Sequence, residues 1–171
     1  MRRGDTGPNA LRDTVRLAEV TESLGYRRFW VAEHHSSRTF VGTSPEILSG
    51  HILSATSRIR VGSGGVLLSH YSPLKIAEQF RTLESLHPGR VDLGIGRAPG
   101  GSQHVAEALA NPRPTAKSDD FPQQVADLAN FLHGTIDTNH QYSDIRVQPG
   151  PSSDTNPEIW LLGSSDVSAK L

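Results

Sequence analysis

The chain has 171 residues, and 17 Lys and Arg stand against 18 Asp and Glu, so its formal net charge is −1. This length suits one domain or part of one. The absence of cysteine excludes disulfide scaffolds, thiolate metal sites and cysteine nucleophiles. No apolar run reaches the roughly 20 residues of a membrane span, no secretory signal opens the chain, and the balanced charge gives no field that attracts nucleic acid. We therefore expect a cytoplasmic globular protein.

A helix is predicted first, because apolar residues recur at helical spacing between Leu11 and Leu24. Asn9 is a suitable N-cap for it, and Gly25 stands just past its end. The apolar run at 29–32 then predicts a short strand that is buried on both faces. A second helix opens at Ser44-Pro45, a cap residue followed by proline. Its predicted inner stripe consists of Ile47, Leu48, Ile52 and Ala55.

The same alternation continues along the chain. A strand is predicted at 59–68, a helix opens at Ser72-Pro73, and the alternating residues of 91–95 predict the next strand. The strands start roughly every 31 residues, which is the size of a strand–helix unit whose strands lie parallel. This series predicts an α/β fold, either a barrel or an open doubly wound sheet.

The regular spacing then breaks. Residues 97–117 are rich in Gly, Pro and Ala and are predicted to form a loop. A helix follows along 121–132, and the polar residues 134–156 are predicted to form an insertion or excursion. A last strand is predicted at 158–162. In either α/β fold, functional residues collect where the strands end.

Three ionisable residues, Glu33, His34 and His35, directly follow the first predicted strand. Burying them without partners would be costly, so they need water, partners or a ligand. They could form a hydrogen-bonded structural pair, contact a ligand or handle a proton. A metal site is a further alternative, although the usual zinc patterns such as H-E-x-x-H are missing.

Three other strand ends carry features that suit a ligand. Gly62-Ser63-Gly64-Gly65 leaves bare backbone, which allows a flat ligand to approach closely or simply forms a turn or bulge. Arg97 is either a fixed cation suited to a phosphate or a surface salt-bridge partner. Gly163-Ser164-Ser165 is either an anion seat or an ordinary N-cap. Together these features suit a phosphorylated planar cofactor.

Three strings in this order resemble the bacterial-luciferase-like flavin monooxygenases: FWVAEHH at 29–35, VGSGGV at 61–66 and GRVDLGIGR at 89–97. The resemblance runs from about Leu11 to Leu171. It implies a (β/α)8 TIM barrel that binds reduced FMN, supplied by a separate flavin reductase, and uses O2 to oxygenate a small organic substrate. The family also allows a homodimer, and no membrane or nucleic-acid partner is implied.

The resemblance also assigns roles to residues. The catalytic histidine of the family corresponds to His34, with Glu33 and His35 beside it. The family's non-proline cis peptide under the flavin ring falls on Gly64-Gly65, and His70 and Tyr71 are further candidates for lining the pocket. The residues implied to bind the cofactor are Ser63, Gly64, Gly65, Arg97, Gly163, Ser164 and Ser165.

Only about half of such a barrel is expected in residues 1–171, with four strands present and the first strand and last three units missing, because a TIM barrel takes about 250 residues. A truncated barrel domain is therefore predicted. Three alternatives stay open. One is a deazaflavin (F420)-dependent hydride-transfer enzyme of the same superfamily. Another is a metal-dependent barrel hydrolase that uses His34, His35 and Asp92. The third is a non-catalytic half-barrel that pairs with itself or with the missing half.

Overall fold

A computed structural model describes residues 6–98, 100–110, 120–150 and 155–163. Its centre is a parallel sheet of four strands in the order β1-β2-β3-β4. The strands are β1 (Arg28–Val31), β2 (Arg60–Leu67), β3 (Val91–Gly96) and β4 (Glu158–Leu162). The helices are α1 (Gly7–Ser23), α2 (Pro45–Ala55), the short 3-10 helix η1 (Leu68–His70), α3 (Pro73–Leu86), α4 (Gln103–Ala110) and α5 (Phe121–His133). The predicted α/β class and parallel sheet are confirmed.

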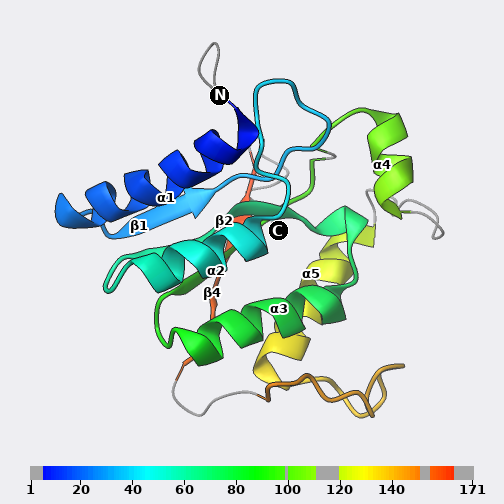
Figure 1. The fold of residues 1–171 in the computed structure, drawn as a ribbon. Coiled ribbons are helices and arrows are strands. Elements are labelled where there is room, and N and C mark those ends of the chain that lie inside the picture. Colours follow the sequence, from blue (N-terminus) through cyan, green and yellow to red (C-terminus); the bar gives the residue numbers. More distant parts are fainter. Residues whose placement is uncertain (1–5, 99, 111–119, 151–154, 164–171) are drawn as a thin grey trace.

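The sheet is covered by helices that start at residues suited to helix starts. Proline occupies the first turn of α1, α2, α3 and α5, where its missing N–H costs no hydrogen bond. Figure 1 shows α2 and α3 lying in front of the strands. Apolar residues of these helices and of α5 pack on β2 and β3 to form the core, including Ile52, Phe80, Leu93, Leu128 and Leu132.

Three local predictions were wrong. The N-cap of α1 is Thr6, whose hydroxyl accepts from the Asn9 amide, and Asn9 lies inside the helix. In α2, Ile47 is 71% exposed, while Ile52 and Leu53 are buried. Within the stretch 97–117, helix α4 replaces part of the predicted loop, since its sequence is rich in alanine, the best helix former.

Strand β1 is less buried than its apolar sequence predicted. Only Val31 is buried, and Trp30 is half-buried. The reason is that successive side chains of a strand point to opposite faces, and the core that the sheet forms with the described helices lies on the face that carries Val31. Trp30 lies on the other face, where its ring meets the edge of Trp160, which is 37% exposed.

The segment at 134–156, predicted as an excursion, forms turns and bends over residues 134–150 and contacts α3. Arg81 of α3 is 1% exposed, and its guanidinium donates to the carbonyls of Pro149, Gly150 and Thr155 and to the Asn156 side chain. Burial lowers the pKa of Arg81, while the nearby Glu84 opposes this shift. One buried cation therefore fixes the chain that leads into β4.

Helix α1 is tied to the start of β2 by Glu22. Its carboxylate accepts hydrogen bonds from the amides of Ser57, Arg58 and Ile59 at 3.0, 2.6 and 2.8 Å. These backbone donors hold the pKa of Glu22 below its usual range. A carboxyl group whose pKa is lowered by folding stabilises the fold at pH values above its ordinary pKa. This contribution is lost as the pH falls through the lowered pKa.

The substitution Glu22→Gln should therefore lower the free energy of unfolding by about 1–2 kcal/mol at pH 7. In urea titrations the difference from wild type should shrink between pH 5 and pH 3, as the wild-type carboxylate becomes protonated. Glu19→Gln, in the exposed part of the same helix, is the matched control and should change little. A Glu22→Gln effect that is equally large at pH 7 and pH 3 would contradict the assignment.

Candidate active site

The most heavily hydrogen-bonded acid at the carboxyl end of the sheet is Glu33, which follows β1 by two residues and is 2% exposed. Its Oε1 lies 2.7 Å from His35 Nε2 and 2.5 Å from the Tyr71 hydroxyl, which donates to it. Its Oε2 accepts from the Leu67 amide at 2.9 Å. The carboxylate thus connects the chain after β1 to the last residue of β2 and to the loop that follows η1.

The backbone of the same segment holds two further loops. The His34 amide donates to Gly42 O at 2.8 Å, and the His35 amide donates to Gly100 O at 3.2 Å. Gly100 belongs to the loop that follows β3. Residues 33–35 therefore contact the chain beyond the ends of both β2 and β3.

The two histidines have different surroundings. The His35 ring is paired with Glu33, and only 13% of its side chain is exposed. His34 is exposed, and its ring stacks on Phe40 with 5.0 Å between centroids. The structure thus brings Glu33 and His35 into direct contact and leaves the His34 ring at the surface.

Two more ionisable groups face Glu33. Burial raises the pKa of Tyr71 far above its ordinary value, and the Glu33 carboxylate raises it further, so the phenol stays protonated. Burial also raises the pKa of Glu46 in the first turn of α2, with a contribution from the charge of Glu33 that His35 opposes. A protonated phenol, a carboxylate and an imidazole therefore lie within one hydrogen-bonded group, which can hold and orient a proton.

Beside this group lies the glycine segment of β2. The Gly64–Gly65 peptide bond is cis, at the position expected from the sequence. Ser63 is fully buried, and its hydroxyl donates to Gly94 O of β3 at 2.8 Å. The Ser63 hydroxyl therefore links two strands and does not point towards a ligand, while Gly64 and Gly65 are partly exposed.

The register of β3 and β4 brings two predicted anion-binding positions together. Gly96 pairs with Leu162, so the next residues, Arg97 and Gly163, follow neighbouring strand ends. Both are exposed, and no described residue forms an ion pair with Arg97. Ser164 and Ser165, the other two predicted residues, lie outside the described residues.

Asp92 does not belong to this site. It is the second residue of β3, and its buried carboxylate accepts from Arg28 Nε, Trp30 Nε1 and Arg60 Nε at 3.0, 2.8 and 2.7 Å. Arg28 and Arg60 also pair with Glu158.

Asp92 thus lies near the amino end of the sheet, whereas His34 and His35 lie beyond the carboxyl end. The hydrolase alternative that combined these three residues was wrong. Within the described ranges no group of three His, Asp or Glu is placed to hold a metal ion.

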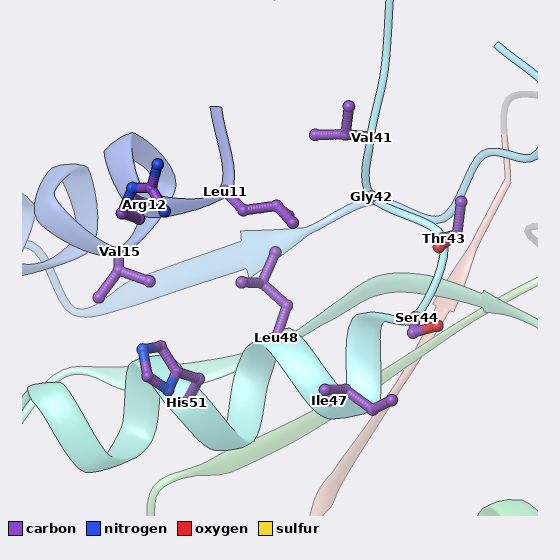
Figure 2. Close-up of a pocket in the computed structure, with 10 residues that line it drawn as sticks. All are labelled: Leu11, Arg12, Val15, Val41, Gly42, Thr43, Ser44, Ile47, Leu48 and His51. Carbon is purple, nitrogen blue, oxygen red and sulfur yellow. The ribbon is translucent and has the colours of Figure 1, made fainter. Parts of the chain in front are cut away.

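A cavity of about 410 Å³ opens elsewhere, between α1, α2 and the loop at 41–44 (Figure 2). It is lined mainly by aliphatic side chains, and none of the predicted site residues lines it. The lining residues are Leu11, Arg12, Val15, Val41, Gly42, Thr43, Ser44, Ile47, Leu48 and His51.

Among the described helices, none is long and apolar enough to cross a membrane.

The chain belongs to the luciferase-like monooxygenase family, whose model matches residues 2–171. An uncharacterized Bacillus subtilis protein, YwcH, is 51% identical over 98% of this chain and 50% of its own length. The N-acetyl-S-alkylcysteine monooxygenase of the same organism is 44% identical over 97% of this chain and 49% of its own length. The crystal structure of apo-MsnO8 superposes with a TM-score of 0.87 at 44% identity, covering 98% of this chain and 48% of that one. The chain thus spans about half the length of these relatives.

More distant structures share the fold and contain cofactors. The oxygenating constituent of 3,6-diketocamphane monooxygenase from Pseudomonas putida, solved with FMN, has a TM-score of 0.75 at 20% identity, over 96% of this chain and 49% of that one. An F420-dependent secondary alcohol dehydrogenase, solved with an F420–acetone adduct, has a TM-score of 0.73 at 17% identity, over 94% and 50%. The structural neighbours are luciferase-like TIM-barrel proteins, and this chain covers about half of each neighbour's length.

From the sequence, Tyr71 is only a further candidate for lining the pocket, and neither Leu67 nor Glu46 is predicted to belong to the site. The sequence separation of Glu33 from Tyr71 is 38 residues, and only the pairing of β1 with β2 brings them together. The parallel register predicted from the strand spacing could have suggested this contact, since both residues follow neighbouring strand ends. The Leu67 amide carries no side-chain signal at all.

The glycine segment gives a direct test of packing at the site. A Cβ added to Gly65 would lie 2.8 Å from the Gly94 backbone and 2.6 Å from Leu162 Cδ1, whereas at Gly64 it would lie 3.2 Å from the Trp30 side chain. Backbone cannot move aside as a side chain can. Gly65→Ala should therefore lower the free energy of unfolding by about 2–3 kcal/mol, and Gly64→Ala by about 1 kcal/mol or less. Urea unfolding of the two variants measures this, and equal losses would contradict the model of strand packing.

Proposed function

We propose that this chain forms half of the barrel of an FMN-dependent monooxygenase, which uses reduced FMN and O2 to oxygenate a small organic substrate. The observation that carries the proposal is the alignment of parallel strand ends. Arg97 and Gly163 follow the paired strand ends of β3 and β4, and the Gly64–Gly65 segment and the Glu33–His35 pair belong to the neighbouring β2 and to the chain after β1. Membership in the luciferase-like family and the 44% identity to a monooxygenase support it.

The described residues fit a phosphorylated flavin. Gly64 and Gly65 present backbone without side chains, as a flat ring system requires for close approach. Arg97 offers an exposed guanidinium, which binds phosphate through two donors. Gly163 would present bare backbone to the same anion. We infer that these residues hold the phosphate end and one face of the ring.

FMN, when bound, supplies the redox chemistry with O2. The residues of this chain would bind it, orient it and manage protons beside it. His34 is exposed and free to exchange protons with a bound ligand, as the family resemblance implies for this position. Glu33 and His35 form the hydrogen-bonded pair behind it, so a proton can be held at a defined place beside the ring.

The activity of the whole protein depends on more than these residues, because the chain spans about half of its relatives' length. We propose that the other half of the barrel covers the face of the sheet on which Trp30 and Trp160 lie. A separate flavin reductase would supply reduced FMN, and a cytoplasmic location fits this supply. A homodimer is compatible with the family.

Binding of FMN is tested by comparing it with riboflavin, which lacks the phosphate. Wild-type chain should quench FMN fluorescence at lower concentration than riboflavin fluorescence. Arg97→Gln should weaken FMN binding about tenfold, equivalent to about 1.4 kcal/mol, because it removes the charged partner of the phosphate. Riboflavin binding should stay unchanged, since Arg97 does not contact the ring in this proposal.

Arg58→Gln is the matched control, because Arg58 is exposed but lies before β2, at the opposite end of the strands. It should leave both affinities unchanged. The same titration with F420 tests the deazaflavin alternative. Absence of any FMN quenching at high micromolar protein, or tighter binding of F420 than of FMN, would overturn the assignment.

A further inference from the structure

The Glu33 carboxylate is almost saturated with donors. A carboxylate has about four lone-pair sites, and three of them face the Leu67 amide, the Tyr71 hydroxyl and His35 Nε2. The Leu67 amide can only donate. The Tyr71 hydroxyl donates as well, and its raised pKa keeps its proton in place.

This arrangement determines the tautomer of His35. With an ionised Glu33, the nitrogen 2.7 Å from Oε1 must carry a hydrogen, because two acceptors at that distance would repel each other. A neutral His35 therefore has its proton on Nε2 and a lone pair on Nδ1. No described residue forms a hydrogen bond with Nδ1, and the ring remains partly accessible.

Groups from several elements surround the Glu33–His35 pair. Tyr71, from the loop after η1, and the Leu67 amide both donate hydrogen bonds to the Glu33 carboxylate. Glu46, from α2, has a raised pKa and faces the same cluster. His34, on the same segment, turns its ring towards Phe40 instead.

We propose that Glu33 is a positioning residue, which acts through His35 by fixing its proton on Nε2 and leaving the Nδ1 lone pair able to accept a proton. His35 Nδ1 can then accept a proton from a bound ligand in addition to His34, and Glu33 stabilises the cation that results. No other co-reactant is needed, since the proton moves from the ligand to Nδ1. The catalytic part rests on the proposed function, whereas the tautomer can be measured without any cofactor.

The test is NMR of the chain labelled with 15N-histidine at pH 8, with His35→Gln identifying the signals. Wild-type His35 should show a protonated Nε2 and an unprotonated Nδ1. In Glu33→Gln the carboxamide must offer its oxygen to the Leu67 amide, which cannot reverse its role. Its NH2 group then faces His35 and donates to Nε2, so the proton should move to Nδ1.

Tyr71→Phe is the matched control, because it removes another partner of the same Oε1 atom without reversing any donor. It should keep the wild-type tautomer. A protonated Nδ1 in the wild type, an unchanged tautomer in Glu33→Gln, or the same switch in Tyr71→Phe would overturn the proposal. If Glu33→Gln does not fold, the wild-type and Tyr71→Phe spectra still decide.

FMN quenching on the same samples separates this inference from the proposed function. A chain that has the expected tautomers but does not quench FMN would refute FMN binding while leaving the positioning of His35 in place. A chain that binds FMN with the opposite tautomer would refute the positioning alone.

Discussion

The carboxyl end of this sheet depends on one buried carboxylate. Parallel strands are hydrogen-bonded along their length, but nothing in a β-ladder fixes the loops that leave it. Glu33 supplies that connection, because its two oxygens bind the Leu67 amide at the end of β2, Tyr71 beyond η1 and His35 on its own segment. A buried carboxylate is costly unless its lone pairs are filled, so the same bonds that orient the loops also keep the charge tolerable.

The two ends of the sheet use their buried acids differently. At the amino end, Asp92 is neutralised by Arg28 and Arg60 and holds the Trp30 indole, which packs below Gly64. At the carboxyl end, Glu33 pairs with no arginine among the described residues and is held by a phenol, an amide and an imidazole. Two cations neutralise Asp92, whereas Glu33 contacts an imidazole, which we propose lets this group handle a proton. This difference underlies the assignment of the candidate site to the carboxyl end.

The sequence was sufficient for the four strands and for helices α1, α2, α3 and α5, because proline and glycine mark the helix ends and apolar periods mark the strands. It missed helix α4, which lies in a predicted loop. It was also sufficient for the positions of Glu33, His35 and Arg97 at strand ends. It could not show that the Ser63 hydroxyl binds Gly94 O, because this contact depends on the exact register between β2 and β3. The exposure of Ile47 was missed for a related reason, since α2 has apolar residues on more than one face and periodicity alone does not select the buried one.

The role of Glu33 as the connection between strand ends is tested most directly by amide hydrogen exchange at Leu67. In the wild type this amide should exchange slowly, and Glu33→Ala should accelerate it about 100-fold, as expected when a hydrogen bond to a charged group is lost. The Val61 amide, which donates to Arg90 O at the other end of β2, serves as the internal reference and should change far less. An unchanged exchange rate at Leu67 would contradict the account.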